Sequence, residues 1–159
     1  PHIYGDVEVQ DEEEVKQNWE KLKLKEGNKS VLSGVTKGTP SMVKAYRIQD
    51  KVKGIGFEFA SAEDAWKKVD EELTEFHAET DPDKKEQELG DVFFSLINYA
   101  RLSGINPDSA LEKTNIKFIS RFQKMEQLAL NKDLKLEDLS LEQMDELWEQ
   151  AKKQDSLKK

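Results

Sequence analysis

The sequence contains no cysteine and two histidines, His2 and His77. A disulfide scaffold is therefore excluded, and the absence of cysteine is compatible with the cytoplasmic location that we expect. Protein zinc sites are built mainly from cysteine and histidine, so a zinc site of the usual composition is not expected. A di-iron site of the helix-bundle type needs Glu-x-x-His on two helices, and no glutamate lies three residues before either histidine.

Long apolar runs are missing as well. No stretch could span a bilayer, and the first residues lack the pattern of a signal peptide. The net charge of -8 and the pI near 5.0 argue against a nucleic-acid polymer or an anionic membrane as partner. The sequence opens with Pro1 and not with methionine, and we expect it to be a fragment of a longer chain.

Alternation typical of strands is absent, whereas helical periodicity runs through the sequence. Its 159 residues suffice for one domain with a real core. The predicted fold class is all-α. Helices are expected at about residues 11–27, 40–53, 61–78, 82–103, 107–130 and 140–151, with the residues from Lys152 onwards frayed.

Helix ends are marked by capping residues. Thr39 before Pro40, and Asp81 before Pro82, predict a cap followed by proline in the first turn. Ser61 is expected to cap the helix that follows it, and Ser140 is expected to form a capping box with Gln143. Phe57 and Phe59 lie in a connector and are expected to fill the core.

Four acids occur in two short pairs on neighbouring predicted helices. Glu72 and Glu75 are three residues apart, as are Glu88 and Asp91, so each pair shares one helix face. The short link between the helices makes them antiparallel neighbours. The four carboxylates are therefore predicted to converge on one small volume.

Each pair borders an apolar stripe that is expected to face the core. The two stripes are Ala65, Trp66, Val69, Leu73 and Phe76 on the first helix, and Leu89, Val92, Phe93, Leu96, Ile97 and Ala100 on the second. Carboxylates held close together cannot all remain ionised without a cation. Either their pKa values rise, or a metal ion binds them.

An all-oxygen ligand set suits a hard cation. Mg²⁺ usually keeps several waters and binds substrate phosphates beside one or two carboxylates. The competing interpretation is a charged, solvated helix pair, and the residues alone leave the two about equally supported.

Basic residues follow the acidic helices. Lys117, Arg121 and Lys124 lie at helical spacing, as a polyphosphate site would require, although an ordinary solvated face has the same pattern. Lys68 lies one turn before Glu72 and could reach a phosphate, but an ion pair with Glu72 is the simpler expectation.

The ordered motifs resemble the MazG nucleoside triphosphate pyrophosphohydrolases. The resemblance rests on the segments 31–40, 45–49, 68–75, 88–91, 115–121, 141–148 and 151–152, and it covers nearly the whole chain. It implies a linker over residues 1–30 that follows a preceding domain, and a catalytic domain over residues 31–159. The implied fold is a four-helix-bundle-type all-α domain that forms a homodimer.

The resemblance also implies roles for individual residues. Mg²⁺ would be bound by Glu72, Glu75, Glu88 and Asp91, while Glu71 matches a motif acid to which we assign no ligand role. Triphosphate contacts would come from Lys117 and Arg121, and Trp148 and Lys152 would close over the nucleotide. The implied reaction converts NTP or dNTP to the monophosphate and pyrophosphate, and a role in cleaning the nucleotide pool follows.

Two other functions remain open at this point. One is a catalytically inactive, nucleotide-binding or regulatory domain, and the other is a helical dimerisation module whose acids are merely solvated. No GxxxxGK[ST] segment occurs, so the β–γ cleavage of P-loop enzymes is not expected.

Overall fold

The computed structural model describes residues 14–19 and 30–157. This part of the chain contains helices and no strand, so the predicted all-α class is confirmed. The chain divides into two compact units, Pro1–Asp108 and Ser109–Lys159. Most of the predicted 1–30 linker and of the helix predicted over 11–27 lies outside the described residues, but residues 14–19 are helical.

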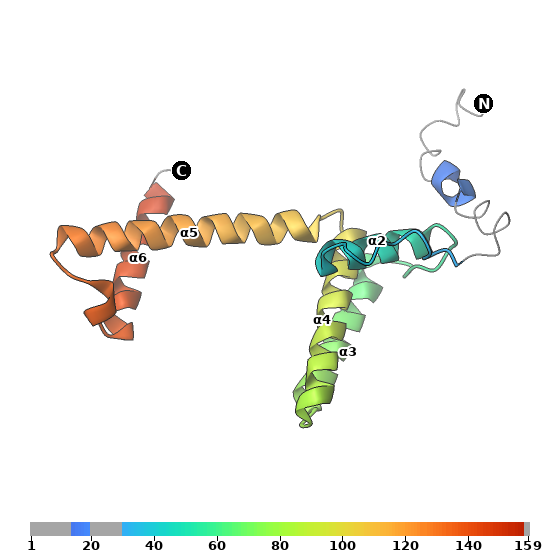
Figure 1. Cartoon of the computed structure of the whole chain (residues 1–159), viewed down its shortest axis with the longest axis horizontal. Coiled ribbons are helices and arrows are strands. Elements are labelled where there is room, and N and C mark those ends of the chain that lie inside the picture. The colour runs from blue at the N-terminus through green and yellow to red at the C-terminus, as the bar shows by residue number, and fades with distance from the viewer. Residues whose placement is uncertain (1–13, 20–29, 158–159) are drawn as a thin grey trace. The chain divides into compact units, whose positions relative to one another are not determined.

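The first unit is built around two helices that lie side by side, α3 (Ala62–Ala78) and α4 (Pro82–Leu102) (Figure 1). Residues 79–81 join them, and this short link makes the helices antiparallel. A third helix, α2 (Ser41–Lys53), packs against α4. None of the described helices of the chain is both long and apolar enough to cross a membrane.

Capping explains where α3 and α4 begin and end. The Ser61 hydroxyl accepts a hydrogen bond from the Asp64 backbone N–H, and the Asp81 carboxylate accepts one from that of Asp83. Pro82 occupies the first turn of α4, where its missing N–H costs nothing. Gly104 follows the end of α4 with a φ of 74°, a conformation that glycine adopts without strain. These three boundaries match the predictions.

The start of α2 differs from its prediction. Pro40, not Thr39, is the N-cap, and it provides no side-chain hydrogen bond. The Thr39 hydroxyl instead pairs with the hydroxyl of Thr36 in the preceding turn, which removes it from the helix end.

Only part of each predicted apolar stripe is buried. Ala65 and Val69 of α3 and Val92 and Ile97 of α4 are buried at the contact between these helices. Four residues of the predicted stripes are exposed instead: Trp66, Leu89, Phe93 and Leu96. Phe57 and Phe59 of the connector were expected to fill the core, and they are exposed as well. Helical period identifies residues that share a face, but a single neighbour covers only the centre of that face.

The second unit contains the helix α5 (Pro107–Asn131) from Ser109 onwards, the 3-10 helix η2 (Leu136–Asp138) and α6 (Leu141–Leu157). Met125, Ala129 and Leu147 form its small core, against which Trp148 packs. Ser140 and Gln143 form the predicted capping box, with reciprocal bonds of 2.9 and 3.1 Å.

Helix α6 does not fray at Lys152 as predicted but continues to Leu157. Asp155 in its last turn forms ion pairs with Arg121 and Lys124 of α5, and these contacts hold the end of the helix. The partners lie more than 30 residues away in the sequence, so no local pattern indicates them.

Candidate metal site

Three carboxylates meet between α3 and α4. Glu72, Glu75 and Glu88 each offer a ligand oxygen, and these oxygens all lie within 4.8 Å of one another. The first two project from one face of α3, and the third comes from the facing turn of α4. The predicted convergence of the two helices' acids therefore holds for these three residues.

Asp91 belongs to the predicted set but not to this group of oxygens. It lies one turn beyond Glu88 on the same face of α4, and it is exposed. Glu71 is also exposed, and its carboxylate lies 3.5 Å from the Lys68 ammonium.

The cluster is buried only in part, at Glu72 and to a lesser extent at Glu88, and this burial is electrostatically costly. Glu72 is only 7% exposed, and one of its carboxylate oxygens is buried without a hydrogen-bond partner in the described part of the chain. Glu88 has a buried oxygen in the same condition. A buried carboxylate oxygen without a donor is strongly disfavoured unless a cation or water reaches it.

Lys68 neutralises only part of this charge. Its ammonium lies 3.0 Å from Glu72, which confirms the expected ion pair one helical turn apart. The hydrogen bond to Glu72 is the main cause that raises the pKa of Lys68. The negative charge of Glu72, followed by burial and by the charge of Glu88, raises the pKa of the Glu75 carboxyl. A raised carboxyl pKa means that the acids still repel one another with Lys68 in place.

The donor set fits a hard divalent cation. All three clustered side chains are carboxylates, which suit Mg²⁺, Mn²⁺ or Ca²⁺ better than a soft metal. Glu72 and Glu88 each also have a buried carboxylate oxygen without a partner among the described residues, so the residues present could hold such an ion.

The basic residues singled out in the sequence lie in the second unit. Lys117 and Lys152 are exposed, whereas Trp148 is half-buried and its ring centre lies 5.1 Å from that of Phe118. Arg121 donates from Nε to Asp155 over 2.9 Å, and Lys124 pairs with the other oxygen of this carboxylate. Hydrogen bonds from Lys124 and Arg121 hold the pKa of Asp155 below its usual value.

Sequence patterns did not indicate Asp155. Its contact with Arg121 leaves the terminal Nη groups of the guanidinium as donors, since Arg carries five N–H groups. The pairing therefore fixes the orientation of Arg121 without using up its capacity to bind an anion.

Replacing Glu75 by Gln should stabilise the metal-free protein. Because the folded-state pKa of Glu75 is raised, its ionisation weakens the fold, and this loss is complete at neutral pH and disappears as the pH falls below the usual value. The variant is therefore expected to have a higher Tm at pH 7 in EDTA and an unchanged Tm at pH 3. Mg²⁺ should raise the Tm of the wild type more than that of the variant.

Glu86→Gln is the matched control, because Glu86 is an exposed acid of α4 outside the cluster. Thermal unfolding followed by circular dichroism gives the comparison. An equal change in Tm for both variants would mean that general charge reduction, and not the cluster, is responsible.

Known proteins similar to this chain were found among curated sequences, whereas no family model matches it. The chain is 37% identical over 155 residues to the nucleoside triphosphate pyrophosphohydrolase/pyrophosphatase MazG of Thermotoga maritima, which covers 96% of this chain and 59% of that protein. It is 32% identical over 164 residues to the nucleoside triphosphate pyrophosphohydrolase of Escherichia coli K12, covering 98% of this chain and 62% of that protein.

A third relative is the uncharacterized protein YabN of Bacillus subtilis, 41% identical over 159 residues, or 96% of this chain and 32% of that protein. The chain thus spans about three fifths of the length of the two relatives with a named activity. Over nearly its whole length the chain is homologous to the MazG proteins, and the family resemblance expected from its ordered motifs is confirmed.

Proposed function

We propose that this chain catalyses metal-dependent hydrolysis of nucleoside triphosphates to the monophosphate and pyrophosphate. The observation that carries the proposal is the convergence of Glu72, Glu75 and Glu88 with two unpartnered buried oxygens, in a chain homologous to proteins named nucleoside triphosphate pyrophosphohydrolase. The reaction would cleave between the α and β phosphates and would remove unwanted NTPs or dNTPs from the cytoplasmic pool.

The metal in this proposal is Mg²⁺, held by Glu72, Glu75 and Glu88, with Asp91 joining them from the next turn of α4. When bound, Mg²⁺ would neutralise the charge of the triphosphate as the phosphorus is attacked. A carboxylate of this segment would orient or deprotonate the attacking water, and Glu75 and the neighbouring Glu71 are the candidates for this role.

Positive side chains would bind the remaining charge of the triphosphate. We assign this role to Lys117 and Arg121, with Trp148 and Lys152 covering the nucleotide, and Lys68 contributing from beside Glu72. Arg121 is preorganised to bind an anion, because its Nε donates to Asp155 while its Nη groups remain available as donors. We also retain the proposal that residues 1–30 form a linker and residues 31–159 the catalytic domain.

A second copy of the chain is the partner we propose. Leu89, Phe93 and Leu96 lie at i, i+4 and i+7 on α4, and all three are more than one third exposed. On α5, Ile116 and Ile119 are 61% and 55% exposed. Contiguous apolar stripes of this kind usually mark protein–protein interfaces. A homodimer would bury them.

Hydrolysis of a panel of NTPs and dNTPs with and without Mg²⁺ tests the reaction. The expected products are monophosphate and pyrophosphate, and Glu72→Gln is expected to lower kcat by about a hundredfold or more because it removes a metal ligand. Glu86→Gln should retain full activity. Diphosphate and phosphate as products would contradict the proposed cleavage, whereas metal-dependent binding without turnover would identify an inactive nucleotide-binding domain.

Sedimentation velocity at micromolar concentration tests the dimer. The expected species has twice the 18.3 kDa mass of the chain, and Phe93→Ser should shift it toward the monomer. A single monomeric species for the wild type would contradict the proposal. An unchanged dimer in the variant would remove the α4 stripe from the interface.

A further inference from the structure

Lys85, near the start of α4, joins the two helices that carry the acidic cluster. Its Nζ donates to the backbone carbonyl of Phe76 over 3.3 Å and to that of Glu79 over 3.3 Å. The same Nζ lies 4.5 Å from the centre of the Phe76 ring, which is a cation–π contact. One ammonium therefore ties the beginning of α4 to the end of α3.

The end of α3 needs such a donor. The last four carbonyls of an α-helix have no partner within the helix, and a cation placed there also interacts favourably with the helix dipole. The carbonyl of Phe76 belongs to the last turn of α3, and Glu79 is the residue that caps this helix. The last turn itself contains no lysine or arginine, so Lys85 supplies the cation from the neighbouring helix.

These contacts lie one turn from the clustered acids on each helix. On α3, Glu72 lies four residues before Phe76, and on α4, Glu88 lies three residues after Lys85. Because the helices are antiparallel, one turn back along α3 and one turn forward along α4 lead in the same direction, from Lys85 to the cluster. The contacts of Lys85 therefore fix the register of the two helices next to the clustered carboxylates.

Tight apolar packing fixes the register on the other side of the cluster. The buried residues Val69 and Val92 lie one turn beyond the acids, on the side away from the link. Residues 73–78 and 82–91 are all described, and none of them is buried as Val69 and Val92 are. On the side of the link, Lys85 thus supplies a constraint that core packing supplies elsewhere.

The register matters because a metal ion needs its ligands at short, fixed distances. Mg²⁺ binds oxygen at about 2.0–2.1 Å and demands near-octahedral geometry. Sliding α4 by a single residue would move Glu88 by about 1.5 Å relative to Glu72 and Glu75. Ligands that are held this loosely bind a metal less tightly, and groups that orient them contribute about tenfold or more in affinity.

We propose that Lys85 is a positioning residue for the metal site, and that its contacts with the end of α3 hold Glu88 at coordinating distance from Glu72 and Glu75. In this role Lys85 acts through the backbone of α3 and not on the metal or the nucleotide. The inference rests on the metal site of the proposed function, but metal binding alone tests it.

The sign of the effect separates positioning from charge. Removing a lysine near several acids lowers the local positive charge, so electrostatics alone would strengthen the binding of a cation. Loss of position would weaken it. Both hydrogen bonds of Lys85 go to backbone carbonyls, so no clustered carboxylate loses a hydrogen-bond partner when the ammonium is removed.

Three variants isolate the ammonium. Lys85→Met keeps an unbranched side chain beside Phe76 and removes the charge. Lys84→Met is the matched control, because Lys84 is the exposed neighbour in α4 and loses the same charge. Lys85→Arg is the rescue, since a guanidinium can donate to both carbonyls and stack on an aromatic ring.

The measurement is isothermal titration calorimetry of the full chain with Mn²⁺, at a temperature where circular dichroism shows each variant to be folded. Lys85→Met is expected to raise the Kd about tenfold. Lys84→Met should leave the Kd equal or lower it, and Lys85→Arg should stay within about threefold of the wild type. In triphosphate hydrolysis, the Mg²⁺ concentration for half-maximal rate should rise about tenfold in Lys85→Met, with kcat at saturating Mg²⁺ within about twofold of the wild type.

Equal or tighter Mn²⁺ binding by Lys85→Met would overturn the positioning role, and so would an equal loss of affinity in Lys84→Met. If Lys85→Met does not fold, Lys85→Gln takes its place, because its amide can donate to one of the two carbonyls. Its Kd is then expected about threefold above that of the wild type, and an unchanged Kd would overturn the role.

The outcomes also separate this role from the proposed reaction. If the wild type hydrolyses triphosphates and Lys85→Met binds Mn²⁺ normally, the positioning role fails and the reaction stands. If Lys85→Met binds Mn²⁺ more weakly while the wild type hydrolyses no triphosphate, the positioning role stands and the reaction fails. Absence of Mn²⁺ binding by the wild type would contradict the metal site and the positioning role together.

Discussion

Mutual repulsion among the carboxylates between α3 and α4 is the constraint on which the first unit's chemistry depends. The helices pack through Val69 and Val92 to form a core, and this packing buries Glu72 and half-buries Glu88, while Glu75 stays exposed beside them. Lys68 offsets only part of the charge, as the raised pKa of Glu75 indicates. A fold that keeps such a cluster is less stable without a metal, and a bound cation would restore that stability.

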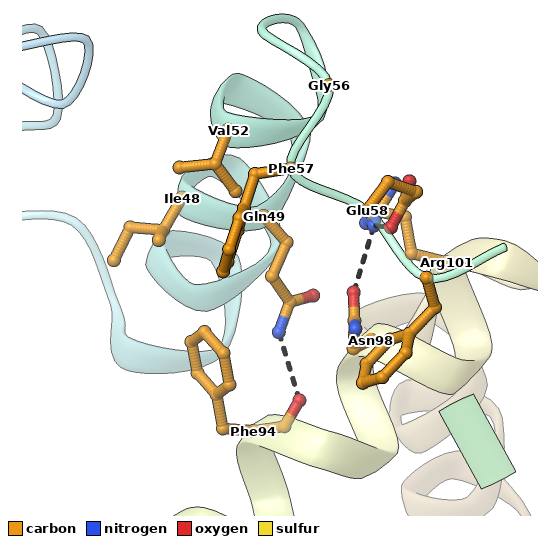
Figure 2. Close-up of a pocket in the computed structure, with 10 residues that line it drawn as sticks. Ile48, Gln49, Val52, Gly56, Phe57, Glu58, Phe94, Asn98 and Arg101 are labelled. Atoms are coloured by element: carbon orange, nitrogen blue, oxygen red, sulfur yellow. Dashed lines mark hydrogen bonds and ion pairs between the residues drawn. The ribbon is translucent and has the colours of Figure 1, made fainter. Parts of the chain in front are cut away.

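Helix α4 carries acids in its N-terminal half, and its C-terminal half lines a cavity together with α2 and the connector (Figure 2). Its N-terminal half carries Glu88 and Asp91, and its C-terminal half carries Asn98 and Arg101. The ion pair of Arg101 with Glu58 anchors the connector, and the bond from Gln49 to Phe94 fixes α2 at the same helix. One helix therefore carries the acids of the second predicted pair and residues that line the cavity.

Sequence reasoning predicted the parts of this arrangement that depend on local chemistry. The caps at Ser61 and Asp81 and the glycine after α4 gave the helix ends, because each acts within a few residues of its position. The spacing of the acids predicted their shared faces for the same reason. The short link between the helices then predicted that Glu72, Glu75 and Glu88 would meet.

Features that depend on distant partners were not predictable in this way. Leu89 and Phe93 have the period of core residues, but no described element covers them, and periodicity carries no information on coverage. Asp155 extends α6 through contacts with Arg121 and Lys124, which are far from it in sequence. The cavity between α2 and α4 was not predictable either, because Gln49 lies 45 residues from its hydrogen-bond partner Phe94 in the sequence.

The most direct test of the account is the anomalous diffraction of crystals grown with Mn²⁺ and an NTP analogue that cannot be cleaved between its α and β phosphates. The account predicts a manganese peak within bonding distance of carboxylate oxygens of Glu72, Glu75 and Glu88, with a phosphate oxygen completing its coordination. A cluster free of manganese, with the metal bound to the analogue elsewhere on the protein, would contradict it.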